Sequence, residues 1–197
     1  MTKPTKPKKP SSFLFLKQYL SEPLGTGSIT PSSKKLAQLM VANLDLEPDD
    51  VVVELGPGTG VFTRALLEKG VLPKNLILVE FSADFAKYLR DEFPGVRIIE
   101  GDACRLPQLL AELGQGAVMR ILSGIPLRSL KPAQRKMITI AMSESLLPGG
   151  IAVQFTYFRT PPLPATVAGE HGMSGRQVAF TMGNVPPAFV WRYAKSE

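Results

Sequence analysis

The sequence predicts an α/β fold, in which a mostly parallel sheet alternates with helices and a C-terminal antiparallel pair of strands completes it. Three observations indicate this. A buried-strand run breaks into a glycine-rich turn and then into a helix. Two more apolar runs follow, each with an acid at or just beyond its end. Near the C-terminus, residues 177–182 and 189–194 flank an Asn-Val-Pro-Pro break that is typical of a hairpin.

Residues 1–10 form a basic segment that is expected to be a disordered tail. The net charge of the 197-residue chain is +6, and this segment supplies four lysines and no acid. The lysines repel one another and three prolines prevent a helix. The four residues are Lys3, Lys6, Lys8 and Lys9.

An amphipathic helix is predicted next, within a segment 11–30 that also holds a loop. Phe13, Leu16 and Leu20 share one face, which Phe15 and Tyr19 extend. This face either packs on the core, or it anchors the chain at lipid headgroups while the lysines are drawn to anionic lipid, at about 1 kcal/mol each. A nucleic-acid tail is a third interpretation, disfavoured because the tail has no arginine and no interleaved aromatics.

The loop over residues 22–33 is rich in Pro and Gly and leads into a second helix, from Lys34 to about Leu44. Ser32 or Ser33 can cap that helix. Because the loop directly precedes the domain that contains the glycine-rich stretch, we expect it to act as a lid over a bound ligand. Residues 31–197 are then the ligand-binding domain.

The glycine-rich turn follows four apolar or β-branched residues, which predict a parallel strand covered on both faces. Its sequence is Glu54-Leu55-Gly56-Pro57-Gly58-Thr59-Gly60. Glycine allows a sharp turn and the close approach of a ligand to the main chain. The helix after it runs from Val61 to Lys69 and ends at Gly70. Such a turn can also serve only to pack a helix close to a strand.

Three acids accompany this turn at the ends of consecutive strands. Glu54 ends the first, Glu80 closes Leu76–Val79, and Asp102 follows Val96–Glu100. Glu80 lies about twenty residues after the last glycine, where a ribose hydroxyl pair would need a carboxylate acceptor. The spacing is not G-x-G-x-x-G, and the G-K-[ST] of a phosphate loop is absent.

This pattern resembles the class I S-adenosylmethionine-dependent methyltransferases, which have a Rossmann-like seven-stranded fold. The resemblance implies that the glycine turn holds the amino-acid part of S-adenosylmethionine, Glu80 the ribose, and Asp102 with Ala103 the adenine. S-adenosylhomocysteine would be the product. The expected cofactor contacts are Ser28, Ile29, Glu54, Gly56, Pro57, Gly58, Thr59, Gly60, Glu80, Phe81, Asp102, Ala103 and Ser123.

The stretch Gly27-Ser28-Ile29-Thr30-Pro31-Ser32-Ser33, preceded by an aromatic-rich helix, is similar to that of the soluble bacterial phospholipid N-methyltransferases. These enzymes methylate phosphatidylethanolamine towards phosphatidylcholine. The related rRNA adenine dimethyltransferases have a similar glycine loop and the same second and third acids. An N-methyltransferase of phosphatidylethanolamine and its methylated intermediates is therefore expected. An rRNA adenine N6-dimethyltransferase and a non-catalytic adaptor that binds S-adenosylmethionine remain alternatives.

The fourth strand is predicted over residues 117–122, and the segment that follows it distinguishes a lipid substrate from an RNA substrate. Enzymes that methylate a base amine place an Asn/Asp-Pro-Pro-aromatic motif there, which holds the amine and stacks on the ring. This chain reads Ser123-Gly124-Ile125-Pro126-Leu127-Arg128 instead. Ile125 offers an apolar wall, and Arg128 is either a partner for a phosphodiester or an ordinary solvated side chain. The candidate catalytic residues are Tyr19 and Tyr157, which would orient the amine, with Ile125 and Arg128.

The remaining elements complete the sheet. A helix is expected from Pro132 to Leu147, ended by Pro148-Gly149-Gly150, and a fifth strand over residues 151–159. Residues 165–176 are expected to form an exposed loop carrying His171, the single histidine.

Composition restricts the remaining possibilities. One cysteine, Cys104, excludes an intramolecular disulfide and is interpreted as a small buried filler. One histidine and one cysteine cannot build a usual zinc site, so no metal is expected. With no signal-peptide core and no long apolar run, we expect a cytoplasmic monomer. It would attach peripherally to the inner membrane surface through Lys3, Lys6, Lys8, Lys9, Phe13, Phe15 and Leu16, without nucleic acid.

Overall fold

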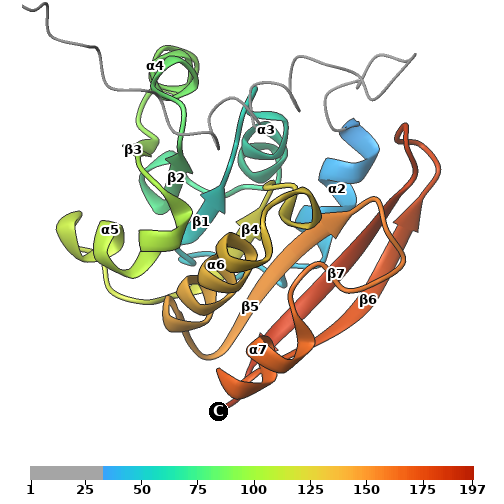
Figure 1. Ribbon diagram of the computed structural model, residues 1–197. Coiled ribbons are helices and arrows are strands. Elements are labelled where there is room, and N and C mark those ends of the chain that lie inside the picture. Colours follow the sequence, from blue (N-terminus) through green and yellow to red (C-terminus); the bar gives the residue numbers. More distant parts are fainter. Residues whose placement is uncertain (1–32) are drawn as a thin grey trace, which may run out of the picture. The chain divides into compact units, whose positions relative to one another are not determined.

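Seven strands form one sheet in the order β3-β2-β1-β4-β5-β7-β6, in a computed structural model that describes residues 33–197. The first five strands are β1 (Val52–Leu55), β2 (Leu76–Glu80), β3 (Arg97–Glu100), β4 (Val118–Ser123) and β5 (Leu146–Thr156). They are mutually parallel. β6 (Met173–Thr181) and β7 (Ala188–Lys195) complete the sheet, and β7 runs antiparallel to both β5 and β6. The predicted fold is confirmed, and Figure 1 shows the strands in this order.

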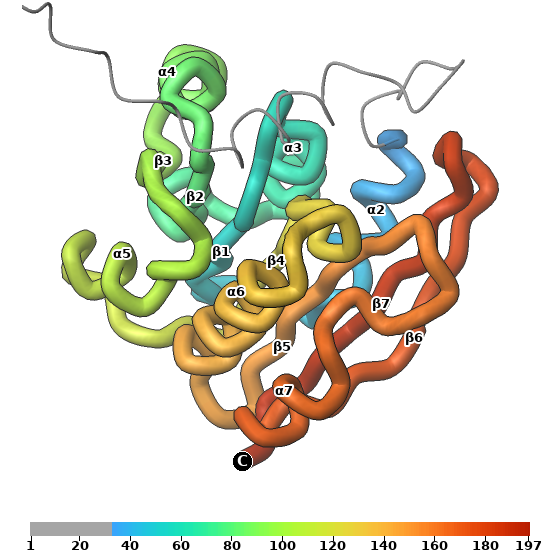
Figure 2. Tube along the Cα trace, viewed as in Figure 1, coloured from blue at the N-terminus to red at the C-terminus, as the bar shows by residue number. Residues whose placement is uncertain are grey.

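Helices cover both faces of the sheet (Figures 1 and 2). One face packs on α2 (Lys34–Ala42), α3 (Val61–Glu68) and α4 (Ala83–Glu92). The other packs on α5 (Leu106–Glu112), α6 (Pro132–Glu144) and α7 (Ala165–Glu170). Three short 3-10 helices, η1 (Pro73–Asn75), η2 (Ala103–Arg105) and η3 (Leu127–Ser129), lie in the connections. Because β1 and β2 are buried along their whole length, their continuous apolar runs carry no alternation.

The described start of the chain agrees with its local signals. The Ser33 hydroxyl accepts the backbone N–H of Leu36 at 3.1 Å and caps α2. The predicted helix after the glycine turn is confirmed, with Lys69 as its C-cap and Gly70 directly after it at φ +105°. The basic tail and the amphipathic helix predicted before α2 lie outside the described residues.

Two expectations near the C-terminus were wrong. α6 ends at Glu144, and Pro148-Gly149-Gly150 lies inside β5 instead of ending the helix. Leu146 pairs with Val118 and Ile151 with Arg120, so three extra residues of β5 bulge out between these two pairs. Proline and glycine mark such a bulge as readily as a helix end, and the sequence alone does not separate the two.

The second wrong expectation is the exposed loop over residues 165–176. It contains α7 and the beginning of β6. Val167 and Ala168 are buried, and this packing stabilises a helix too short to form alone. His171 caps α7, and its carbonyl accepts from Ser143 and Lys195.

Among residues 33–197, no helix is long and apolar enough to cross a membrane.

Candidate active site

The site residues predicted in the described chain lie at the carboxyl ends of the parallel strands. Backbone hydrogen bonds tie these ends together. Gly56 N–H donates to Val79 O at 2.9 Å, Gly101 N–H to Glu80 O at 2.9 Å, and Gly124 N–H to Leu55 O at 2.8 Å. The glycine turn after β1, the end of β2, the turn after β3 and the exit of β4 therefore form one continuous edge, where ligands of open α/β sheets bind.

Two glycines of the turn have different reasons for their missing side chain. Gly60 has φ +77°, and a Cβ there would collide with the Phe93 ring, so this glycine lets α4 pack close to α3. Gly58 has φ +53°, and a Cβ there would meet nothing within 4 Å. The packing interpretation of the turn thus holds for Gly60 and fails for Gly58, whose bare backbone faces open space.

Glu80 links the turn to β2. One carboxylate oxygen accepts the Gly58 N–H at 3.1 Å, and the other accepts the Ser82 N–H at 2.9 Å. The side chain is almost completely buried, and this burial raises its pKa above the ordinary range although the backbone donors oppose the shift. Glu80 therefore fixes the position of the glycine turn and retains acceptor capacity at the sheet edge.

Glu54 is a fully buried acid whose hydrogen bonding is incomplete. One oxygen accepts the Thr63 hydroxyl at 2.8 Å, and the other has no partner within residues 33–197. Burial raises the pKa of Glu54 to about 8, the Thr63 hydrogen bond opposes the shift, and the nearby Glu80 adds to it. A buried carboxyl group with an unpaired oxygen requires either a proton or a cation.

Asp102 lies exposed at the end of β3. Its carboxylate accepts the Cys104 N–H at 2.9 Å and caps η2, while Ala103 is buried beside it. Cys104 is half-buried, and burial, with the charge of Asp102, raises the pKa of its thiol to about 12. A thiol with that pKa is not a nucleophile at neutral pH.

The exit loop of β4 is held by a residue that the sequence reasoning missed. The fully buried Gln154, on β5, donates to Ile125 O at 2.9 Å and to Phe155 O at 2.8 Å. Its side-chain oxygen has no partner within the part of the chain that the structure describes. The signal was a single amide inside the apolar run from Ile151 to Phe158. Thr63, the partner of Glu54, was missed too.

Ser123, an expected cofactor contact, and Ile125, a candidate for the acceptor side, lie at this same exit. Ser123 is fully buried, and its hydroxyl accepts the Ile125 N–H at 3.4 Å. Ile125 packs directly on the glycine turn, because a Cβ on Gly56 would come within 2.8 Å of its side chain.

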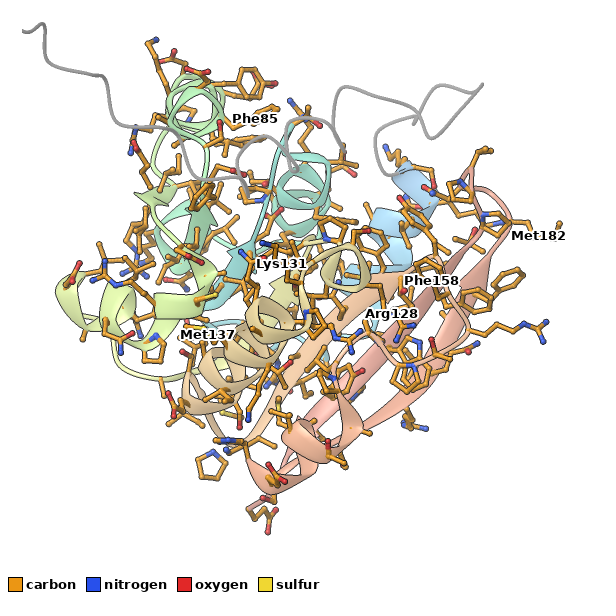
Figure 3. All side chains as sticks on the ribbon, viewed as in Figure 1. Phe85, Arg128, Lys131, Met137, Phe158 and Met182 are labelled. Atoms are coloured by element: carbon orange, nitrogen blue, oxygen red, sulfur yellow. The ribbon has the colours of Figure 1, made fainter. Side chains whose placement is uncertain are left out.

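Tyr157 and Arg128 lie further out. The Tyr157 ring meets Phe155 edge-on, with centroids 5.3 Å apart. The Arg128 guanidinium lies 5.5 Å from the centre of the exposed Phe158 ring, and Figure 3 shows the two side by side. Burial, and then the charge of Arg128, lowers the pKa of Arg135 on α6. Two guanidiniums close together favour a shared anionic partner.

The other predicted cofactor contacts in the described chain differ in exposure. Pro57 is buried, Thr59 is exposed and Phe81 is half-buried. Three predicted site residues, Tyr19, Ser28 and Ile29, lie outside the described residues.

Comparisons with known proteins agree on a family. The family model of ribosomal RNA adenine dimethylases matches residues 31–121. An ornithine lipid N-methyltransferase from Singulisphaera acidiphila is 33% identical over 148 residues, which are 73% of this chain and 77% of that protein. A ribosomal RNA small subunit methyltransferase A from Chlorobium chlorochromatii is 37% identical over 86 residues, 44% of this chain and 31% of that protein.

Solved structures share the fold. A precorrin-6y C5,15-methyltransferase from Geobacter metallireducens superposes with a TM-score of 0.64, at 17% identity, covering 87% of this chain and 93% of that one. At that identity the similarity shows the fold alone. Together with the family match and the relative aligned over most of its length, the glycine turn and its acids identify the methyl donor as S-adenosylmethionine, and the chain belongs to the class I S-adenosylmethionine-dependent methyltransferases.

Proposed function

We propose that this enzyme transfers methyl groups to the ethanolamine nitrogen of phosphatidylethanolamine and of its methylated intermediates, at a membrane surface. The exit loop of β4 carries this proposal. From Ser123 to Arg128 it presents apolar side chains and a guanidinium, and neither an Asn/Asp nor an aromatic ring that would hold a base. The greater coverage of the ornithine lipid enzyme than of the rRNA enzyme also favours a lipid.

The cofactor fits the unpaired groups of the site. The unpartnered oxygen of Glu54 suits the ammonium of the amino-acid part, and the open space at Gly58 admits a ligand against the backbone. Glu80 would accept from the ribose hydroxyls, and the exposed Asp102 from the adenine amine. When bound, S-adenosylmethionine supplies an activated sulfonium methyl group.

The acceptor side must provide a neutral amine. A lipid ethanolamine is protonated at neutral pH, and each pKa unit above ambient costs about 1.4 kcal/mol to remove the proton. Burial against Ile125 and Pro126 would lower that pKa, as would a nearby positive charge. Tyr157, packed on Phe155, would orient the amine, and Arg128 would bind the phosphodiester. Tyr19 is a further candidate for orientation.

An rRNA adenine dimethyltransferase is the second candidate function, because the family model that matches residues 31–121 is named for that activity. That match stops before the exit loop of β4, where the acceptor would bind. Attachment to an anionic inner membrane surface through the N-terminal lysines and Phe13, Phe15 and Leu16, as a cytoplasmic monomer, is part of the lipid proposal.

One incubation separates these functions. The full chain is mixed with labelled S-adenosylmethionine and, separately, with vesicles of phosphatidylethanolamine, vesicles of ornithine lipid and total RNA. Label in phosphatidylethanolamine is the expected result. If only RNA or only ornithine lipid becomes labelled, that molecule is the acceptor and the proposal is wrong. If the cofactor binds but no acceptor becomes labelled, the chain is the non-catalytic adaptor. Tyr157→Phe is expected to slow lipid methylation, and a parent-like rate would remove its proposed role.

A further inference from the structure

The turn between β6 and β7 exposes large apolar side chains at the same edge of the sheet as the candidate active site. Because β5 and β6 are both antiparallel to β7, they run in the same direction, and residues 182–187 lie at the carboxyl edge of the sheet. Met182 is 77% exposed and Val185 is 69% exposed, the two highest values among the large apolar side chains described. Figure 3 shows Met182 at the tip of this hairpin.

Two further apolar side chains enlarge this surface. Phe158, 51% exposed, follows the end of β5 at the same edge, and Phe180, 47% exposed, is the second-last residue of β6. The Phe180 ring lies 4.9 Å from that of Phe189 across the hairpin. We call Phe158, Phe180, Met182 and Val185 the apolar rim. Single exposed apolar residues are ordinary, whereas several at one edge indicate an interaction surface.

The turn that carries the rim is fixed by hydrogen bonds. Asn184 is buried, accepts the Ser33 N–H at 2.8 Å and donates to Pro186 O at 3.0 Å. The Thr181 hydroxyl accepts the Gly183 N–H at 3.0 Å. The polar side chain of the turn is thus directed inward and spent on structure, while Met182 and Val185 are held outward.

The charged side chains that lie next to rim residues are cations. Arg128 lies over Phe158, Arg159 follows Phe158, and the aliphatic stem of Lys35 lies beside Gly183. From Val118 onward the acids are Glu144, Glu170 and Glu197. Each of these follows or ends an element that runs to the opposite edge of the sheet: α6, α7 and β7. This half of the chain therefore places cations and no acid at the carboxyl edge.

We propose that the apolar rim inserts into the interface of a bilayer that contains anionic lipid. Arg128, Arg159 and Lys35 would lie at the level of the headgroups, and the active-site edge would face the lipids. The most exposed rim residues, Met182 and Val185, are aliphatic and match acyl chains, and flanking cations match anionic headgroups. This inference deepens the proposed function and rests on it, because a lipid substrate is the reason to expect a bilayer at this edge.

The first test measures partition of the full chain onto vesicles of phosphatidylcholine and phosphatidylglycerol, which contain no proposed substrate. Met182→Asp with Val185→Asp is expected to weaken partition at least about tenfold, or about 1.4 kcal/mol. The matched control is Leu72→Asp with Leu147→Asp, two exposed residues that precede β2 and begin β5 at the opposite edge. The control pair should bind like the parent, and both pairs should retain cofactor affinity.

A second measurement does not depend on the folding of the charged variants. In a Cys104→Ser background, Met182→Cys carrying an environment-sensitive dye should shift to the blue on adding vesicles, and Leu147→Cys should not. Unchanged partition with no shift at residue 182, or equal losses in both charged pairs, would overturn the proposal. The proposal would also be overturned if the parent protein were a dimer and Met182→Asp with Val185→Asp converted it to a monomer. Methylation of dispersed short-chain phosphatidylethanolamine, measured in parallel, reports on the proposed function separately.

Discussion

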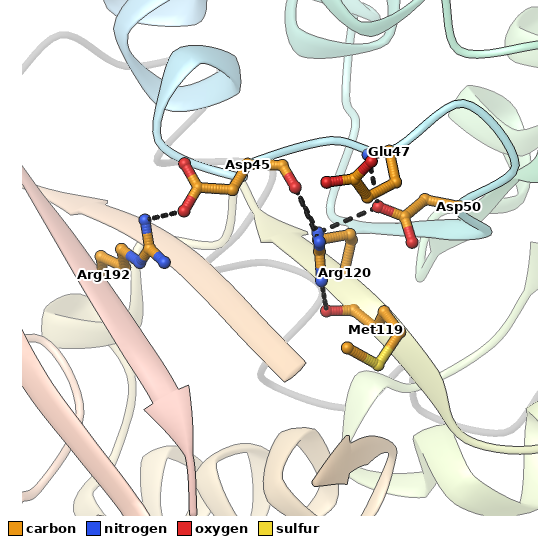
Figure 4. Close-up of polar contacts among 6 residues, drawn as sticks. All are labelled: Asp45, Glu47, Asp50, Met119, Arg120 and Arg192. Atoms are coloured by element: carbon orange, nitrogen blue, oxygen red, sulfur yellow. Dashed lines mark hydrogen bonds and ion pairs between the residues drawn. The ribbon is translucent and has the colours of Figure 1, made fainter. Parts of the chain in front are cut away.

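Two buried ionisable side chains at opposite edges of the sheet, Arg120 and Glu54, differ in how completely the chain pairs them. At the amino edge, the guanidinium of Arg120 bonds Asp50 at 3.1 Å, Asp45 O at 2.6 and 3.0 Å, and Met119 O at 3.1 Å (Figure 4). At the carboxyl edge, Glu54 and Gln154 each keep a buried oxygen without a partner among residues 33–197.

The difference teaches where to expect a ligand. A buried charge with all its partners inside the chain stabilises the fold or holds it in register. A buried polar group that the chain leaves incomplete costs stability and is retained where something else completes it. Removing the paired Arg120 should therefore change folding, and removing the incompletely paired Glu54 should change binding.

The largest expected effect is at the amino edge. Arg120→Met leaves Asp50 and the Asp45 carbonyl without their buried donor, so the free energy of unfolding should fall by about 3–5 kcal/mol. Chemical denaturation measures this loss, and calorimetry should find the cofactor affinity of the folded protein unchanged. The control is Lys87→Ala, which removes an exposed pair with Asp91 and should cost less than about 1 kcal/mol. A loss of cofactor affinity in Arg120→Met without unfolding would break the comparison.

The glycine turn allows the same comparison within three residues. Gly60→Ala should destabilise the protein by more than Gly58→Ala, because its Cβ meets the Phe93 ring and that of Gly58 meets nothing. Both pay roughly 1–2 kcal/mol for a side chain at positive φ. Gly58→Ala should instead weaken cofactor binding, by about tenfold or more, since its methyl group enters the space at the bare backbone. Parent-like affinity in Gly58→Ala, by calorimetry, would remove Gly58 from the cofactor site.

Glu54→Gln tests the incomplete carboxyl group through pH. The pKa of Glu54 is about 8 in the folded protein and near 4.5 when unfolded, so it holds its proton more tightly in the folded state. Its contribution to stability is fully present below pH 4.5 and is lost as the pH rises to about 8. Thermal unfolding of the parent should show this decline, at up to about 1.4 kcal/mol per pH unit from Glu54. Glu54→Gln should show a smaller decline, because only the raised pKa of Glu80 still contributes to it.

Cofactor affinity should also depend on the ionisation of Glu54, but it should rise with pH where stability falls. The ammonium of the cofactor favours the ionised carboxylate, so the affinity of the parent should rise between pH 6 and pH 8. In Glu54→Gln the affinity should be lower, by about tenfold for the lost charge pair, and this rise should be absent. The cofactor's own amino group titrates alike in both proteins, so the difference isolates Glu54. Identical pH profiles would show that Glu54 does not meet the ammonium.

The smallest expected effect concerns the exit loop of β4. Gln154→Leu removes the donor that holds the Ile125 carbonyl, and kcat should fall several-fold, by about 1 kcal/mol for one hydrogen bond, while cofactor affinity stays constant. Gln177→Leu is the control for removing an amide from the same part of the sheet, because Gln177, which is exposed, and the buried Gln154 both pair with Trp191, from opposite sides of β7. Equal effects in the two variants would assign Gln154 a general packing role.

The sequence by itself determined the fold and pointed to the edge where we propose that the cofactor binds. Gly56, Gly58 and Gly60 with Glu54, Glu80 and Asp102 are local signals, because a glycine at positive φ and an acid at a strand end are properties of short segments. Where signals were ambiguous, as in the Pro-Gly-Gly bulge of β5 and in α7, packing decided the outcome.

Only the tertiary structure decided the partners of buried groups and the neighbours of the site. Periodicity indicates that Arg120, Glu54 and Gln154 lie in buried strands, but it says nothing about the contacts across 75 residues that satisfy Arg120, or about the oxygens left unpaired. The position of Met182 at the same edge as the candidate site likewise follows from strand order, because the direction of β6 is set by its antiparallel pairing with β7. Long-range pairing is a property of the folded chain, and no local pattern encodes it.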